Sequence, residues 1–123
     1  MSAPKRILVI DDDPDILEIL YIIFEQERYH VILSQTGEEA DRIDEINPDL
    51  VLLDLEILSS NKNGAVICAQ IKSRPETSNL PVILLSSKPE VGQICSECGA
   101  DGYMRKPFEI ARLSEKVKQF LAA

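Results

Sequence analysis

The stretch ILVIDDDP, residues 7–14, joins a continuous apolar run to three consecutive carboxylates and a proline. Two later stretches repeat this form, since residues 50–54 are LVLLD and residues 82–87 are VILLSS. Short continuous apolar runs are typical of strands that are buried on both faces of a parallel sheet. The carboxyl ends of such strands line one crevice. The sequence therefore predicts that carboxylates and hydroxyls meet at a single edge of the sheet.

Helix-type patterns lie between the strand-type patterns in strict alternation. Strands are expected at about Arg6–Ile10, His30–Ser34, Leu50–Leu53, Val82–Leu85 and Gly102–Arg105. Helices are expected from Pro14 to about Glu27, from Thr36 to about Ile46, and at about Ala65–Ser73, Glu90–Cys98 and Ile110–Leu121. The second helix is expected to begin with a capping box in which Glu39 reaches back to Thr36. This alternation predicts an α/β fold, a doubly wound parallel sheet of five strands with helices on both faces. Because the first, third and fourth runs are the most apolar, the expected strand order is 2-1-3-4-5.

The composition excludes several classes of function. The 123 residues fit one core, so a single domain over residues 1–123 is expected. The net charge of -8, from 21 acidic and 13 basic residues, argues against a nucleic-acid surface. The apolar stretches fall short of the roughly 18 residues that a membrane span needs. The first residues also lack a secretory signal, so a cytoplasmic location without membrane contact is expected.

Three cysteines, Cys68, Cys95 and Cys98, are an odd number and do not indicate a disulfide framework. The last two form a C-x-x-C pair in the later half of an expected helix, whereas a redox thiolate is usually stabilised at a helix start. Zinc would need further ligands, and the one histidine, His30, lies in another strand region. Packing on a helix face is therefore favoured over redox or metal chemistry.

Carboxylates follow two strands that are neighbours in the expected order. Asp11 and Asp12 follow the first strand, and Asp54 follows the third. Carboxylates this crowded raise one another's pKa unless a cation neutralises them. Mg²⁺ prefers carboxylate, water and phosphate oxygens, so a Mg²⁺ site is predicted at these residues. Asp13 precedes Pro14 at the start of the first helix and is assigned to helix capping.

Two more polar groups are expected at the same edge. Lys106 follows the fifth strand, and Ser86 follows the fourth. A lysine can pair with a carboxylate and then with the oxygens of a phosphoryl group on it, while a hydroxyl donates to another of those oxygens. The set of groups thus suits acyl-phosphate chemistry.

The whole chain resembles the receiver domain of two-component response regulators, including single-domain chemotaxis regulators. Four segments in order carry the resemblance, namely residues 7–14, 48–54, 81–86 and 99–108. The resemblance implies a flavodoxin-like (βα)₅ fold and the following roles: Asp54 as phosphoacceptor, Asp12 as direct Mg²⁺ ligand, Asp11 as ligand mainly through water, and the backbone carbonyl of Glu56 as third protein ligand. It further implies that Lys106 pairs with the phosphoryl group, that the bond to Pro107 is cis, and that Ser86 and Tyr103 are the switch hydroxyl and switch aromatic.

A receiver of this kind accepts a phosphoryl group from a histidine kinase or histidine phosphotransfer protein and then presents a changed surface to a downstream protein target. The aspartyl phosphate is labile, so such a domain is an enzyme only towards itself. Two alternatives stay open from the residues. One is a receiver-shaped interaction module without phosphorylation. The other is a phosphatase with Asp54 as nucleophile and Glu56 as acid/base.

Three features depart from the usual family pattern. The stretch 55–64 is about two residues longer than is common and lacks a proline, a change that costs little stability. Arg28 stands where many members have glycine after the first helix, so either a left-handed non-glycine residue is expected there or the helix ends differently. Ile19, Tyr21 and Ile22 lie off the apolar arc of the first helix, and they are either a docking patch for the phosphodonor or ordinary surface.

Overall fold

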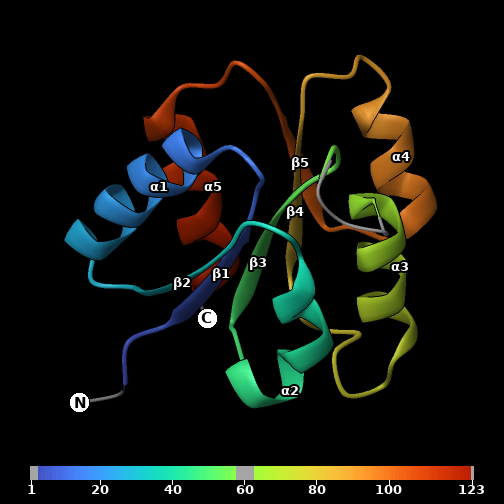
Figure 1. Ribbon diagram of the computed structural model, residues 1–123, viewed down its shortest axis with the longest axis horizontal. Coiled ribbons are helices and arrows are strands. Elements are labelled where there is room, and N and C mark those ends of the chain that lie inside the picture. The colour runs from blue at the N-terminus through green and yellow to red at the C-terminus, as the bar shows by residue number, and fades with distance from the viewer. Residues whose placement is uncertain (1–2, 58–62, 123) are drawn as a thin grey trace.

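Five parallel strands and the helices between them form the protein over residues 3–57 and 63–122, the part that the computed structural model describes (Figure 1). The elements in chain order are β1 (Arg6–Ile10), α1 (Pro14–Gln26), β2 (His30–Ser34), the 3₁₀ helix η1 (Glu38–Arg42), α2 (Ile43–Ile46), β3 (Leu50–Asp54), α3 (Gly64–Ser73), β4 (Val82–Ser86), α4 (Val91–Cys98), β5 (Gly102–Arg105) and α5 (Ile110–Leu121). The predicted alternation is confirmed. Half of the longer stretch noted after the third strand, residues 58–62, lies outside the described residues.

The sheet has the order β2-β1-β3-β4-β5, as predicted. The central strands β1, β3 and β4 each pair on both sides, and every residue of β3 and β4 is buried. The outer strand β5 alternates between partly buried and exposed positions, and β2 begins with an exposed residue and is otherwise buried or partly buried. Continuous apolar runs therefore occupy the centre because both of their faces are covered.

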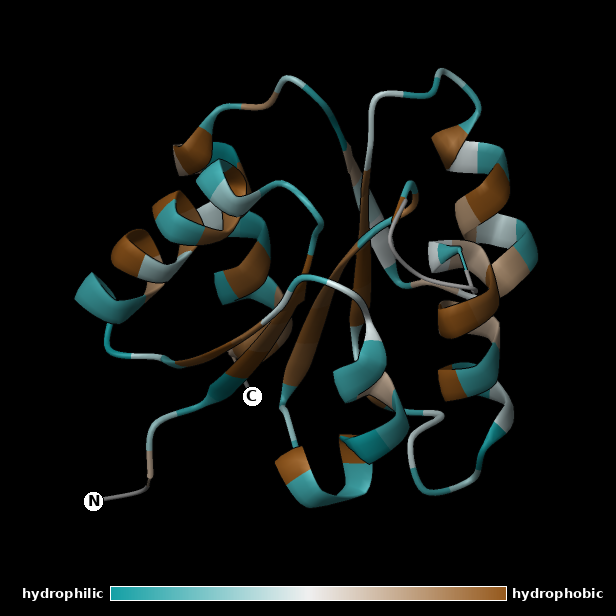
Figure 2. Ribbon diagram, in the orientation of Figure 1, coloured by the Kyte–Doolittle hydropathy of each residue, from teal (hydrophilic) through white to brown (hydrophobic). Residues whose placement is uncertain are grey.

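Two hydrophobic layers form because successive strand residues point to opposite faces of the sheet. Leu8, Val51 and Leu84 face the layer that α2, α3 and α4 cover. Ile7, Leu52 and Leu85 face the layer that α1 and α5 cover. Figure 1 shows α1 and α5 together on one side of the sheet, and Figure 2 shows the central strands as largely brown, apolar segments between these helices and α3 and α4 on the other side. The central strands therefore lie between two apolar layers.

The first helix begins and ends as expected. Asp13 caps it, since its Oδ1 accepts a hydrogen bond of 2.9 Å from the Asp15 N–H. After the helix, Arg28 has a φ of 70°, so the left-handed residue is the one of the two expected helix ends that the structure has. The apolar residues off the core arc are exposed: Ile19 by 48%, Tyr21 by 39% and Ile22 by 48%.

The start of the second helical segment differs from the prediction. Gly37 precedes η1 with a φ of 85°, and only Ile43–Ile46 is α-helical. The capping box is wrong: the Glu39 carboxylate accepts a hydrogen bond from the buried hydroxyl of Ser34, while the Thr36 hydroxyl accepts the Glu38 N–H at 3.2 Å. A buried hydroxyl requires a partner, and Glu39 meets that requirement instead of capping the helix.

The three cysteines are free thiols in the layer of α3 and α4. Cys68 and Cys95 are buried, and burial raises the pKa of both thiols. The predicted packing role is confirmed. None of the helices within residues 3–57 and 63–122 has the length and apolar character to cross a bilayer.

Candidate functional site

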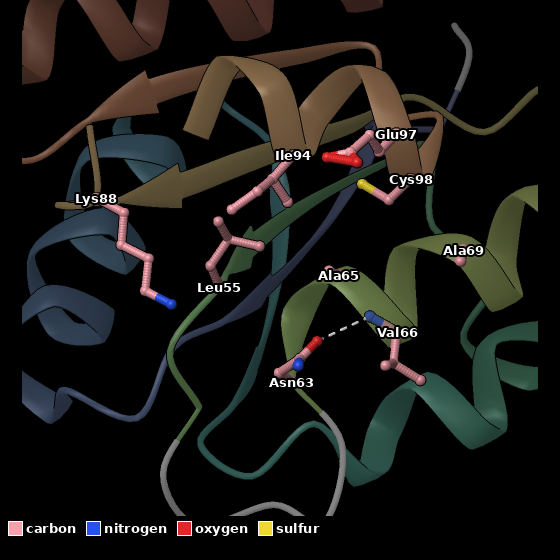
Figure 3. Close-up of a pocket in the computed structure, with 9 residues that line it drawn as sticks. All are labelled: Leu55, Asn63, Ala65, Val66, Ala69, Lys88, Ile94, Glu97 and Cys98. Atoms are coloured by element: carbon pink, nitrogen blue, oxygen red, sulfur yellow. Dashed lines mark hydrogen bonds between the residues drawn. The ribbon is translucent and has the colours of Figure 1, made fainter. Parts of the chain in front are cut away.

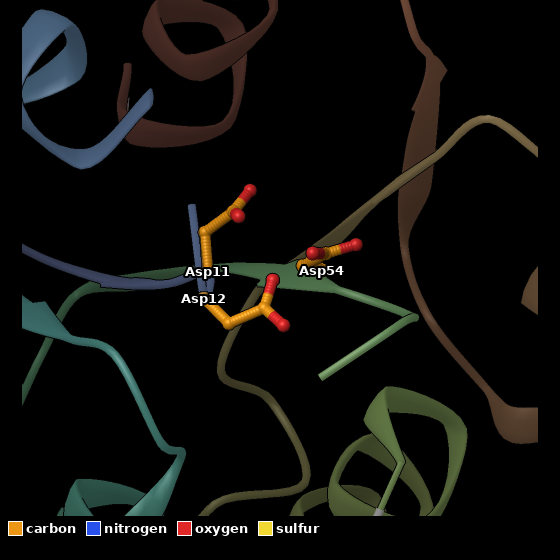
Figure 4. Close-up of side chains that lie close together, drawn as sticks. All are labelled: Asp11, Asp12 and Asp54. Atoms are coloured by element: carbon orange, nitrogen blue, oxygen red, sulfur yellow. The ribbon is translucent and has the colours of Figure 1, made fainter. Parts of the chain in front are cut away.

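Three carboxylates meet at the carboxyl-terminal edge of the sheet. Asp11 and Asp12 directly follow β1, and Asp54 ends the neighbouring strand β3. Each offers one oxygen within 4.8 Å of the oxygens of the other two. Figure 4 shows the three side chains close together at the two strand ends. Asp11 and Asp54 are buried, whereas Asp12 is partly exposed, so the cluster opens towards solvent on one side.

Backbone N–H groups hold two of these carboxylates in place. Oδ1 of Asp11 accepts the N–H of Asp13 at 2.9 Å. Oδ1 of Asp54 accepts the N–H of Glu56 at 3.1 Å. Each bond spans two residues and forms where the chain turns out of its strand. The second oxygen of each carboxylate is thereby directed to the crevice.

Lys106 links both buried carboxylates. Its Nζ lies 3.1 Å from Oδ2 of Asp11 and 3.5 Å from Oδ2 of Asp54. The Lys106 N–H donates to the carbonyl of Ser86 at 2.8 Å, and the following bond to Pro107 is cis, as expected. Burial alone would lower the pKa of Lys106, but the charges of the two carboxylates outweigh burial and raise it. Lys106 therefore stays an ammonium beside the two acids.

One ammonium does not fully compensate the crowded acids. Burial, followed by the negative charge of Asp11, raises the pKa of Asp54 to about 7, although Lys106 opposes the shift. A hydrogen bond with the Glu56 side chain raises it further. A second cation would relieve this repulsion, and an all-oxygen donor set suits a hard ion such as Mg²⁺. The residues present thus fit the magnesium site that the sequence predicted.

Ser86 makes a contact that the sequence analysis did not identify. Its hydroxyl is fully buried, donates to Oε1 of Glu56 at 2.7 Å and accepts the N–H of Lys88 at 3.0 Å. Sequence reasoning assigned Glu56 a role through its backbone carbonyl, and that role stays a prediction. An acidic residue two positions after Asp54 was the available signal for the side-chain contact.

Tyr103 lies on the strand next to Ser86, but its side chain is directed elsewhere. Its strand partner is Leu84, the middle residue of β4, two positions before Ser86. The ring is 41% exposed and rests over α4, where a Cβ added to Gly92 would lie 3.1 Å from the tyrosine hydroxyl. In this arrangement the aromatic ring packs on α4.

Gly64 was also missed from the sequence, although it lies against the acceptor strand. A Cβ at this position would lie 2.3 Å from the carbonyl oxygen of Asp54 and 2.8 Å from Cα of Leu55. The Gly64 N–H donates to the Leu55 carbonyl at 3.1 Å. The dipeptide Asn63-Gly64 at the helix start was the sequence signal, since the Asn63 side chain caps α3 through the Val66 N–H. Only glycine allows α3 to begin this close to Asp54.

Two pockets border the strand ends. One of about 410 Å³ lies between α3 and α4 (Figure 3), with apolar side chains such as Val66 and Ile94 along it and Lys88 at one end. None of the three clustered carboxylates lines it. The other, of about 380 Å³, lies between α1 and the segment that leads into α5, and Lys106 is part of its wall. The second pocket is therefore the one that adjoins the carboxylate cluster.

Comparison with known proteins agrees with this geometry. A family model described as the response regulator receiver domain matches residues 7–118. The chain is 34% identical over 117 residues to the DNA-binding response regulator MtrA of Mycolicibacterium smegmatis, and the alignment covers 93% of this chain and 49% of that protein. The chain thus spans about half the length of this curated relative.

Solved structures agree as well. The signal receiver domain of a signal transduction histidine kinase from Syntrophus aciditrophicus is 32% identical, with a TM-score of 0.85 and coverage of 96% of this chain and 90% of that one. The response regulator protein TrrA from Thermotoga maritima, solved in complex with Mg²⁺-BeF, is 35% identical, with a TM-score of 0.83 and coverage of 95% and 99%. The resemblance noted from the sequence and the expected fold are both confirmed.

Replacement of Gly64 by alanine should disturb the acceptor strand. The new Cβ has no room beside the Asp54 carbonyl, so we expect a loss of roughly 2 kcal/mol or more in the free energy of unfolding. Urea unfolding at neutral pH measures this loss. Gly102→Ala is the matched control, because a Cβ there meets its nearest neighbour, the Phe120 ring, at an ordinary 3.5 Å. Equal midpoints for the two variants would contradict the close approach.

The raised pKa of Asp54 makes stability depend on pH. The folded carboxyl keeps its proton up to about pH 7, whereas an unfolded aspartate releases it near pH 4. The native state therefore binds more protons in this window, and the stability that the group contributes is full below about pH 4 and lost as pH rises through 7. Without divalent cations, Asp54→Asn should exceed the wild type by roughly 2–4 kcal/mol at pH 8 and by roughly a third as much at pH 5. Urea unfolding in EDTA at both pH values measures this, and a gain of the same size at both would refute the assigned shift.

Proposed function

The chain belongs to the family of response regulator receiver domains, and from that premise we propose that it accepts a phosphoryl group on Asp54 within a two-component or phosphorelay system. The observation that carries the proposal is the bridge from Lys106 to Asp11 and Asp54, with Nζ at 3.1 and 3.5 Å from the two carboxylates. The phosphodonor is a phosphohistidine of a histidine kinase or histidine phosphotransfer protein.

In this reaction the only covalent role of the protein is that of the Asp54 nucleophile. A carboxylate oxygen of Asp54 forms a bond to phosphorus as the phosphorus–nitrogen bond of the phosphohistidine breaks, and the imidazole keeps the electron pair. Such a transfer depends on positioning and on neutralisation of charge spread over the phosphoryl oxygens. The Glu56 N–H positions the Asp54 carboxylate, and Lys106 supplies positive charge beside it.

A magnesium ion is part of this proposal. Asp11, Asp12 and Asp54 would hold it, together with the backbone carbonyl of Glu56. When bound, the ion would supply charge neutralisation for the carboxylates and for the phosphoryl oxygens. The complex with Mg²⁺-BeF of the relative from Thermotoga maritima supports this assignment.

The output of the domain is a changed surface and no further catalysis. Phosphorylation would recruit the Ser86 hydroxyl to a phosphoryl oxygen, and the Tyr103 ring would leave α4 for the space near β4. The added negative charge on Asp54 would thus shift Ser86 and Tyr103 from one arrangement to another. A downstream protein target would detect the resulting change in the surface around α4. The domain would act as an enzyme only in its own phosphorylation and dephosphorylation, at the cytoplasmic location expected from the sequence.

A single mass experiment separates this proposal from its alternatives. With acetyl phosphate and Mg²⁺, the wild type should gain one phosphoryl group in intact mass spectra. Asp54→Asn should gain none, because the nucleophile is absent, and Asp12→Ala should react far more slowly. Asp13→Asn is the control that should react normally, since Asp13 caps α1 and asparagine caps equally well.

Each other outcome points to another function. A wild type that gains no phosphoryl group would indicate an interaction module without phosphorylation. Continuous hydrolysis of varied phosphate esters would indicate a phosphatase. A full adduct on Asp54→Asn would place the acceptor elsewhere.

The pocket of about 380 Å³ suits the helical surface of the phosphodonor. Its walls are mainly apolar and include Ile19 of α1 and Phe108 after β5. Lys106 lines it too, so a partner helix seated there would hold its phosphohistidine close to Asp54. An apolar contact also fits a chain whose net charge of -8 would not steer an acidic partner.

Ile19→Glu should therefore weaken docking of the donor. We expect phosphotransfer from the cognate kinase to slow by about tenfold or more relative to phosphorylation by acetyl phosphate, since a charge would be buried in an apolar contact. Radiolabel transfer and intact mass give the two rates. Val66→Glu, at a similarly exposed apolar position on α3, is the control. If both variants behave alike, the docking surface lies elsewhere.

A further inference from the structure

The hydroxyl of Ser86 already has hydrogen-bond partners in the unphosphorylated protein. It donates its hydrogen to Oε1 of Glu56 at 2.7 Å, and its oxygen accepts the Lys88 N–H at 3.0 Å. A hydroxyl has one hydrogen to donate. While Glu56 accepts it, that hydrogen is not available to any other acceptor.

The position of Glu56 makes this hydrogen bond relevant to Asp54. Its N–H donates to Oδ1 of Asp54 at 3.1 Å, and its side chain forms a hydrogen bond that raises the pKa of the Asp54 carboxyl. The Glu56 carboxyl group therefore lies beside both Asp54 and Ser86. A phosphoryl group that is bonded to Asp54 and accepts from Ser86 must enter this same space.

We propose that the side chain of Glu56 is a gate that occupies the phosphoryl position of the resting protein and must turn away before Ser86 can bind a phosphoryl group on Asp54. The inference rests on the proposed function of Asp54 and adds a positioning residue to it. It concerns the side chain of Glu56, which acts through Ser86, and is separate from the backbone carbonyl.

Burial and charge both support such an exchange. Ser86 is fully buried, so its hydroxyl would lose a hydrogen bond if Glu56 left without a replacement acceptor. A phosphoryl oxygen is such a replacement, and its negative charge repels the Glu56 carboxylate from the same place. Glu56 is only partly buried, which leaves its carboxylate a route to solvent. The resting and phosphorylated states would thus exchange one anionic acceptor of the Ser86 hydroxyl for another.

Binding of beryllium fluoride, an unreactive analogue of the phosphoryl group, tests the gate directly. Affinity is measured by ¹⁹F NMR titration at saturating Mg²⁺. Glu56→Ala should bind the analogue about tenfold more tightly than the wild type, because no side chain has to leave. Glu90→Ala is the control for charge, since it removes an exposed carboxylate at the start of α4, and it should change the affinity by less than twofold.

A double-mutant cycle separates the gate from a general charge effect. In a Ser86→Ala background, Glu56→Ala should tighten binding by less than about threefold, because the hydroxyl through which Glu56 acts is absent. An unchanged or weaker affinity of Glu56→Ala would overturn the inference, and so would an equal gain in both backgrounds. A wild type that binds no beryllium fluoride and takes up no phosphoryl group would instead refute the proposed function of Asp54.

Discussion

The mutual repulsion of buried carboxylates is the constraint on which the rest of the structure depends. Parallel pairing aligns Ile10 with Leu53, and the next residues of the two strands, Asp11 and Asp54, are therefore side by side. Both are buried, so their charges are poorly screened by water. A single ammonium, that of Lys106, partly offsets the repulsion, and the remainder appears as the raised pKa of Asp54. Such a site favours any cation or proton that lowers its charge.

The surrounding fold is organised to keep this costly arrangement in place. The strand ends are rigid because apolar layers cover β1, β3 and β4 on both faces. Backbone N–H groups just beyond the strands donate hydrogen bonds that hold the carboxylates of Asp11 and Asp54. Lys106, which reaches both carboxylates, directly precedes the cis bond to Pro107. Gly64 brings α3 against the backbone of Asp54, so a helix closes the crevice on one side. Stability elsewhere in the core thus compensates for an electrostatically unfavourable edge.

The resting protein also shows where a response to phosphorylation would begin. The Ser86 hydroxyl is bound to Glu56, and the Tyr103 ring lies over Gly92 on α4. These two contacts lie on neighbouring strands, β4 and β5, on the route from Asp54 to the surface of α4. Each is specific to the residues of this chain, since a shorter residue at 56 or a larger one at 92 would remove it. Under the proposed phosphorylation of Asp54, these individual side chains would set the threshold of the response.

The sequence by itself determined the strand order, the two helical layers and the strand ends that carry Asp11, Asp12, Asp54, Ser86 and Lys106. These features follow from local patterns, because apolar periodicity and the residues at strand ends are encoded over a few positions. Only the tertiary structure decided that Glu39 bonds Ser34 and does not reach back to Thr36, that Glu56 meets Ser86 across 30 positions, and that Gly64 must lack a side chain. Each of these depends on the distance between atoms that belong to different elements of the fold. Such distances are set by how helices pack on the sheet, and no spacing of residues along the sequence specifies them.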